Sequence, residues 1–249
     1  MSRILKAVVC FVFAAAALAQ THVTPGRVGM VMIANAGDGF ALAADSASTN
    51  ADGTLSTVQK LLPAGKNGAV LFAGAVSIQD PVGRPVREEV NVARIATAWL
   101  DSHRDTTLQT ADTEINAAVS QAVTKFFSTR KPGAEAGGYR FAIVFAGYAD
   151  GKPAVSVTRY FIPVSKGKAP RAVHVSYKAK AGDAWILGGS RPSWKLKGSS
   201  TQDLLSSFDA ILKTAEEHSS KTARGPSAVT PPNRFATVTV KDGFAVVIR

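Results

Sequence analysis

Two kinds of hydrophobic pattern alternate along the chain. Short apolar runs rich in β-branched residues, separated by glycine-containing turns, are typical of antiparallel hairpins. They come first, return after the middle and close the chain. These predicted strands are Val28 to Ile33, Phe40 to Ala44, Ala69 to Ala73, "GYRFAIVFAGY" (138–148), "AVSVTRYFI" (154–162), Val173 to Tyr177, Ala184 to Leu187, Phe235 to Val240 and Phe244 to Ile248.

Between the strands, apolar residues repeat at helical spacing in three places. The first stripe begins at Val92, and a second follows a polar break around Arg104 to Thr110. A third begins after Ser200, a good helix cap, with Asp203 three residues on. The stripes are Val92, Ile95, Ala96, Trp99 and Leu100; Ile115, Val119, Ala122, Val123 and Phe126; and Leu204, Leu205, Phe208, Ile211, Leu212 and Ala215.

This order of elements predicts an α+β fold in which helices pack outside antiparallel sheets. Only one cysteine is present, Cys10, so a disulfide is not expected. The fold must then be held by its hydrophobic core, and a single domain of this length can bury about 70–75% of its unfolded surface.

The first nineteen residues are typical of an export signal. Arg3 and Lys6 precede an apolar run from Ala7 to Leu18, which closes with the small residues Ala17 and Ala19. The run is shorter than the roughly 20 residues that a membrane span needs. We therefore expect a signal peptide at 1–19, an N-terminal extension at 20–27, a domain at 28–249, and a periplasmic or extracellular location.

The charge is strongly basic. The formal net charge is +11, and removal of Arg3 and Lys6 with the signal leaves +9. Much of the excess lies between Lys152 and Lys197, but no aromatic residues are interleaved there as in stacking surfaces for nucleic acid. The pattern favours a solvated basic face, excludes nucleic acid as the expected partner, and leaves open weak attraction to an anionic cell surface.

Four segments together resemble the proteasome β-type subunits and their bacterial relatives. They are "VGMVMIANAGDGFALAADSAS", "VQKLLPAGKNGAVLFAGA", "FAIVFAGYADGKPAVSVTRYF" and "FATVTVKDGF", and they occur in the family's order over most of residues 28 to 248. The resemblance implies the N-terminal nucleophile (Ntn) hydrolase fold. That fold is a four-layer αββα sandwich of two stacked antiparallel sheets with helices outside them.

Hairpin counting then places Asp45 beside the start of the first strand and, in a second hairpin, Lys60 close to Gly74. A turn at Gly37 and Asp38 puts Asp45 opposite Met30 and Ser46 opposite Gly29, and a turn near Lys66 puts Lys60 opposite Phe72. In the family that the chain resembles, an acid and a lysine flank a terminal threonine, and a glycine N–H stabilises the oxyanion. Asp45, Lys60 and Gly74 match these three roles.

The nucleophile does not match. Ungapped counting from Asp45 places the catalytic position at Gly29, which has no hydroxyl, and signal removal would leave Gln20 to Val28 in front of it. Using Thr24 would slide the strand by five residues and reverse its faces. Using Thr21 would move the hydroxyl about 26 Å along an extended strand.

Two further family positions also differ. The expected serine after "AWILG" falls on Gly189, with Ser190 one place late. The acid expected after the third helix is absent near Ser219 and Ser220, where the insertion "SSKTARGPSAVTPPN" stands instead. These departures point to a lost peptidase site, in which Asp45 and Lys60 serve either as a structural ion pair or in a ligand pocket.

Two alternatives stay open. One is an active Ntn-type peptidase or amide hydrolase that uses Thr21 as its N-terminal nucleophile, or Ser46 or Ser190. The other is a structural or binding protein that forms rings or dimers through its outer helices and takes a peptide or small amide ligand. The histidines show no spacing that supports a serine triad, and no motif implies a metal or an organic cofactor.

Overall fold

The computed structural model describes residues 21–24, 29–49, 55–79, 89–128, 138–162, 170–188, 195–222 and 233–247. The predicted signal peptide, Ser190 and most of the insertion after the third helix lie outside these residues. Over the described part of the chain, no helix is both long and apolar enough to cross a membrane.

Two sheets form the centre of the molecule. The first has the order β1-β13-β2-β3-β14-β15 and the second the order β12-β11-β10-β7-β6. The strands of the first are β1 (Thr21–Thr24), β13 (Ala184–Gly188), β2 (Met30–Asn35), β3 (Phe40–Ala44), β14 (Arg234–Thr239) and β15 (Gly243–Val247), and those of the second are β12 (Arg171–Lys178), β11 (Lys152–Ile162), β10 (Gly138–Ala149), β7 (Gly68–Gly74) and β6 (Leu61–Pro63). Two small hairpins pair β4 (Ala47–Thr49) with β5 (Leu55–Thr57) and β8 (Ser77–Gln79) with β9 (Glu89–Asn91).

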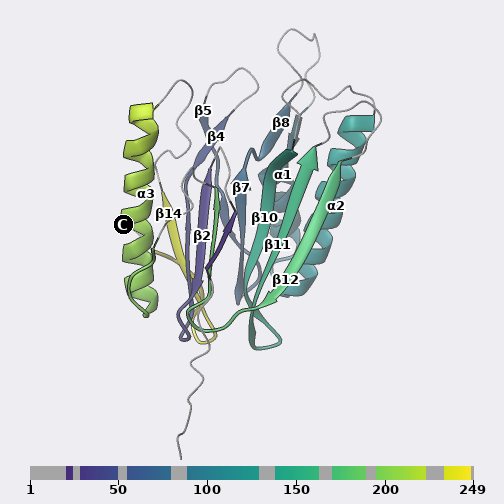
Figure 1. Ribbon diagram of the computed structural model, residues 1–249. Coiled ribbons are helices and arrows are strands. Elements are labelled where there is room, and N and C mark those ends of the chain that lie inside the picture. The colour runs from purple at the N-terminus through teal and green to yellow at the C-terminus, as the bar shows by residue number, and fades with distance from the viewer. Residues whose placement is uncertain are drawn as a thin grey trace, which may run out of the picture.

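Three helices cover the outer faces of the sheets. α1 (Val92–Ser102) and α2 (Leu108–Ser128) pack on the five-stranded sheet, and α3 (Thr201–Thr222) packs on the six-stranded sheet. Figure 1 shows α3 on the left, the two sheets in the middle, and α1 and α2 on the right. The predicted four-layer αββα sandwich is therefore confirmed.

The apolar residues divide into three cores, one at each junction between layers. The middle core lies between the sheets and holds Trp185, which is 1% exposed, with Tyr177 packed against it. The outer cores join α1 and α2 to one sheet and α3 to the other. Alternate residues of β2 and β3 face different cores, as expected for strands buried on both faces.

Several local predictions hold closely. Ser200 caps α3 as expected: Asp203 N donates to Ser200 Oγ at 3.1 Å, and Ser200 N donates to Asp203 Oδ2 at 3.4 Å. The first hairpin closes as counted, with Ala36 N donating to Gly39 O at 2.8 Å.

Some boundaries were wrong, and each error has a physical cause. α2 begins at Leu108, inside the predicted polar break, because Thr107 caps it and Leu108 is buried. α3 runs to Thr222, which includes the first residues of the insertion. The strand predicted at Val28 to Ile33 is β2, which spans Met30–Asn35 and extends to Asn35 because that residue still pairs with Phe40.

One edge of the six-stranded sheet departs from the antiparallel expectation. β1 pairs in parallel with β13, with Thr21 opposite Ala184 and Thr24 opposite Leu187. Hairpin patterns contain no signal for this pairing, because it joins segments about 160 residues apart in the sequence. The predicted N-terminal extension therefore adds a strand to the domain.

Candidate functional site

The candidate site lies where β2 begins and β3 ends. The register places Val31 opposite Ala44, so that Asp45 lies opposite Met30 as predicted. Asp45 N donates to Met30 O at 3.0 Å, and Met30 N donates to Asp45 Oδ1 at 2.9 Å. Two hydrogen bonds thus fix the carboxylate at the first residue of β2.

The five-stranded sheet brings Lys60 to the same place. Leu61 pairs with Leu71, and Phe72 N donates to Lys60 O at 3.0 Å, so the predicted register of this hairpin is also confirmed. Lys60 Nζ lies 3.0 Å from Asp45 Oδ1, and both side chains are 0% exposed. Burial removes water from the ammonium and lowers the pKa of Lys60 from its ordinary value, and the attraction to Asp45 opposes only part of this effect.

Gly29 lies at the point where these groups converge. A Cβ at this position would lie 2.5 Å from Lys60 Nζ, 3.3 Å from Gly74 N and 3.4 Å from Asp45 Oδ1. Any side chain on residue 29 would therefore meet the lysine, the acid and the glycine N–H named from the sequence. The ammonium of Lys60 itself takes the space that such a side chain would need.

The backbone around Gly29 is closely packed as well. Gly29 has φ +71°, in the left-handed region that L side chains rarely adopt. A Cβ on Gly188, at the end of β13, would come within 1.8 Å of Gly29 O. Two glycines thus allow β2 and β13 to meet at the site.

The other hydroxyls named from the sequence lie differently. Thr21 pairs with Ala184, four residues along β13 from Gly188, which is about 13 Å along an extended strand. Ser46 is next to Asp45 and is 2% exposed, and its carbonyl accepts from Val58 N at 2.8 Å. Ser190 lies outside the described residues.

The chemistry of the arrangement follows from these contacts. A buried lysine with a lowered pKa could favour deprotonation of a neighbouring hydroxyl, and a glycine N–H could stabilise a developing oxyanion. Gly29 has no side-chain atom that could attack a carbonyl. Two surface hollows, of about 490 Å³ beside α3 and about 380 Å³ beside α1, are lined by residues other than Asp45, Lys60 and Gly74.

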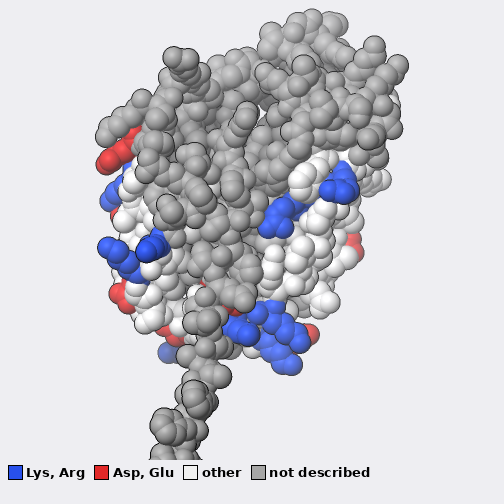
Figure 2. Space-filling model, in the orientation of Figure 1, with Lys and Arg blue, Asp and Glu red and all other residues white. Residues whose placement is uncertain are grey.

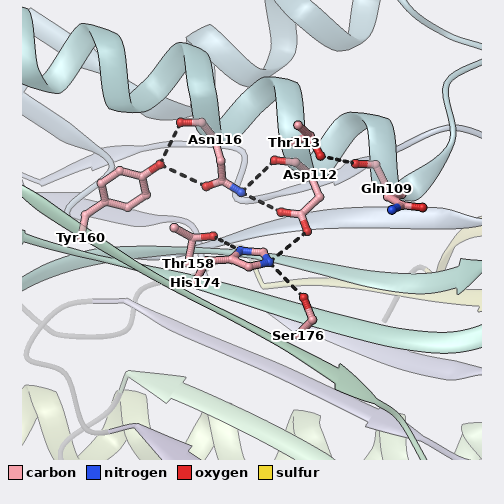
Figure 3. Close-up of polar contacts among 8 residues, drawn as sticks. All are labelled: Gln109, Asp112, Thr113, Asn116, Thr158, Tyr160, His174 and Ser176. Carbon is pink, nitrogen blue, oxygen red and sulfur yellow. Dashed lines mark hydrogen bonds and ion pairs between the residues drawn. The ribbon is translucent and has the colours of Figure 1, made fainter.

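A second polar cluster links β11, β12 and α2 (Figure 3). His174 Nδ1 lies 2.8 Å from Thr158 Oγ1, while His174 Nε2 lies 2.9 Å from Ser176 Oγ and 3.7 Å from Asp112 Oδ2. The amide of Asn116 extends the cluster, because its Nδ2 donates to Asp112 Oδ1 at 2.7 Å. Tyr160, whose pKa burial raises to about 12, donates its hydroxyl to Asn116 Oδ1 at 3.0 Å.

This cluster has the residue types of a serine triad but a different geometry. A triad needs the serine and the acid on opposite ring nitrogens of the histidine. Here Ser176 and Asp112 both face Nε2, and the other nitrogen faces Thr158, which is 2% exposed. The cluster therefore ties β12 to β11 and α2. Sequence spacing could not reveal it, because its members lie on three separate elements.

Within the part of the chain that the structure describes, no three His, Cys, Asp or Glu side chains are grouped so that they could hold a metal ion. The described site consists of the Asp45–Lys60 ion pair, the Gly74 N–H, and Gly29, on which these groups converge.

Comparisons with known proteins give similarity to solved structures only. No family model matches the sequence, and no curated protein matches it. Among solved structures, the chain is similar to Anbu from Hyphomicrobium sp. strain MC1, at 13% sequence identity and a TM-score of 0.42. The match covers 88% of this chain and 87% of that chain. At this level of similarity, the match carries no conclusion about catalysis, ligands or assembly.

Proposed function

We propose that this chain is an exported, proteasome-like protein of the Ntn-hydrolase fold that lacks threonine-peptidase activity. The observation that carries the proposal is the glycine at residue 29. A Cβ on this residue would lie within 3.4 Å of Lys60, Gly74 and Asp45, the residues that match the family's site, yet glycine bears no hydroxyl or thiol. The residues that match the family's site are thus present around a position that offers no nucleophile.

Two further observations support loss of activity. An Ntn mechanism needs a free α-amine on the nucleophile residue, whereas Thr21–Thr24, upstream of Gly29 in the chain, form β1 of the six-stranded sheet. Lys60 also occupies the space of the missing side chain and is fully buried. We therefore assign Asp45 and Lys60 a structural role, in which the pair joins the ends of the two sheets.

Export is part of the proposal and rests on the charged, apolar and small-residue regions of positions 1–19. Intact-mass analysis of the protein purified from its native cell envelope measures the mature N-terminus. The proposal expects a chain that begins at Gln20. A chain that begins at Thr21 would favour the amine-dependent alternative.

The test of inactivity is a peptidase assay on the mature protein with a mixture of fluorogenic peptides. We expect no cleavage above that of Lys60→Met. The matched control is Lys213→Met, which makes the same replacement at a lysine whose side chain is 66% exposed. Cleavage that persists in Lys213→Met and disappears in Lys60→Met would overturn the proposal.

The oligomeric state belongs to the same proposal. The outer faces of α1, α2 and α3 are the surfaces through which rings or dimers would form. Light scattering across micromolar concentrations measures the mass in solution, and a monomer throughout would remove assembly from the proposed function.

A further inference from the structure

The basic charge of the chain is concentrated in one hairpin. Residues 151–182, which contain β11 and β12, hold no Asp or Glu. Figure 2 shows Lys and Arg gathered at the end of the molecule where the β10–β11 turn lies in Figure 1. The basic residues of this segment are Lys152, Arg159, Lys166, Lys168, Arg171, Lys178 and Lys180.

The outer strand of this hairpin is an edge strand. β12 pairs with β11 on one side and ends the five-stranded sheet. Ala179 N donates to Pro153 O at 3.2 Å, so odd-numbered residues of β12 direct their backbone groups toward β11. The even-numbered residues then direct theirs outward, and all four are exposed: Ala172, His174, Ser176 and Lys178.

The edge is also held rigid. The His174 ring is fixed between Thr158 on β11 and Ser176 on β12, with Asp112 of α2 at 3.7 Å (Figure 3). A strand that is already ordered loses little conformational entropy when another strand is added to it. β12 is therefore preorganised for pairing.

Common protective features of edge strands are missing from the middle of β12. Natural edges are blunted by bulges, prolines or inward-pointing charges. β12 pairs with β11 without a register shift from Arg171 to Lys178, contains no proline, and has charged residues only at these two ends. Arg171 is further positioned by the Phe161 ring, whose centroid lies 5.4 Å from its Cζ.

We propose that β12 binds an extended acidic peptide segment of a partner protein by strand addition. Backbone groups of residues 172–178 would pair with the peptide, and its carboxylates would pair with Arg171 at one end and Lys178 at the other. Matching acids in the peptide lie seven positions apart, on opposite faces, as do these two residues. At the Lys178 end, Lys152 and Lys180 add positive charge.

The charges favour this partner over two others. Antiparallel self-pairing of β12 must join even-numbered residues of the two copies, because these direct their backbone groups outward. With Ala172 opposite Lys178, each end would bring Lys178 of one copy beside Arg171 of the other, and this gathering of like charges is unfavourable. Binding to a flat anionic membrane requires basic side chains that point in the same direction. Arg171 and Lys178 point to opposite faces of the sheet. A membrane surface would not pair with the outward backbone groups, and a second copy of β12 would not neutralise the two charged ends.

The test uses the mature protein and the fluorescein-labelled peptide Glu-Thr-Val-Thr-Ser-Thr-Val-Glu. Fluorescence anisotropy at low ionic strength should show saturable binding. The same peptide with Lys in place of both Glu residues should not bind. Absence of binding by the acidic peptide up to millimolar protein, or equal binding by the Lys peptide, would overturn the proposal.

Two variants separate strand addition from simple charge attraction. Ala172→Pro removes one outward N–H without removing a hydrogen bond to β11, and we expect its affinity to fall about tenfold. Ala172→Thr keeps that N–H and should bind as the wild type does. Equal affinities of these two variants would overturn strand addition, provided that thermal unfolding shows both to be folded.

A third comparison addresses the charged ends. Arg171→Glu and Lys178→Glu should each weaken binding of the acidic peptide by about tenfold or more. The contrary result is that the wild-type protein binds phosphatidylglycerol vesicles and not the peptide, with vesicle binding lost in both variants. That result would assign this edge to an anionic surface and overturn the proposal.

Discussion

The Asp45–Lys60 pair makes a quantitative prediction about stability. Lys60→Met leaves the Asp45 carboxylate buried without the lysine charge, although the Met30 N–H still donates to it, and Asp45→Asn leaves the Lys60 ammonium buried beside a neutral amide. Removing one member of a buried pair costs about 3–5 kcal/mol of unfolding free energy, because the other charge is left uncompensated. Such a loss is a large fraction of the roughly 5–15 kcal/mol that stabilises a domain.

The double variant distinguishes the pair from two independent contributions. Asp45→Asn combined with Lys60→Met leaves no buried charge, so its loss of stability should be smaller than the sum of the two single losses by about 3 kcal/mol. Equilibrium urea unfolding at neutral pH, followed by tryptophan fluorescence, to which buried Trp185 contributes, measures all four proteins of the cycle.

The control is a second cycle at the surface. Lys213 Nζ lies 2.8 Å from Asp209 Oδ2 on α3, but the Lys213 side chain is 66% exposed. Its cycle with Asp209→Asn and Lys213→Met should give a coupling of about 0.3–0.5 kcal/mol. If the Asp45–Lys60 coupling were no larger than this, burial of the pair would not have the stabilising role that the contacts indicate.

Three further predictions concern stability, each measured by urea or thermal unfolding. Because the pKa of Lys60 is lowered below 10.5, the unfolded chain binds more protons than the folded chain between the lowered value and 10.5. Stability should therefore rise with pH in that window, and this gain should be absent in Lys60→Met. Gly188→Ala should cost about 3 kcal/mol or more, since its Cβ would lie 1.8 Å from Gly29 O, whereas Gly151→Ala, with φ +72° and nothing within 4 Å, should cost about 1–2 kcal/mol. Ser200→Ala should cost about 1 kcal/mol through loss of the α3 cap, and a result within error of zero would contradict that capping role.

The parts of the site that depend on local geometry could be predicted from the sequence. A hairpin turn at Gly37 and a strand period of two are enough to place Asp45 opposite Met30, and the structure has this register. The same counting around Lys66 placed Lys60 opposite Phe72. Turns fix registers over short distances, so these pairings could be obtained by counting.

The parts that depend on long-range pairing could not be obtained in this way. The parallel pairing of β1 with β13, and the position of β13 beside β2, join segments far apart in the chain, and no turn residue specifies them. The contact between Gly188 and Gly29 follows from that pairing and was therefore missed. The His174 cluster was missed for the same reason, because a helix and two strands supply its members.

The long-range contacts change what the glycine at residue 29 implies. From the sequence, the site lacks one hydroxyl, and Gly29→Thr would be the obvious repair. In the structure, the Cβ of this threonine would lie 2.5 Å from Lys60 Nζ. Its backbone would also have to adopt φ +71°, which L side chains rarely do. Lys60 could shift, since its amine is the end of a flexible chain, but it would weaken its contact with Asp45 in doing so. The new residue would also remain joined to Val28 and would have no α-amine to act as a base. Recovery of peptidase chemistry therefore requires three changes together: a hydroxyl at residue 29, a relaxed backbone there, and a chain that begins at that residue.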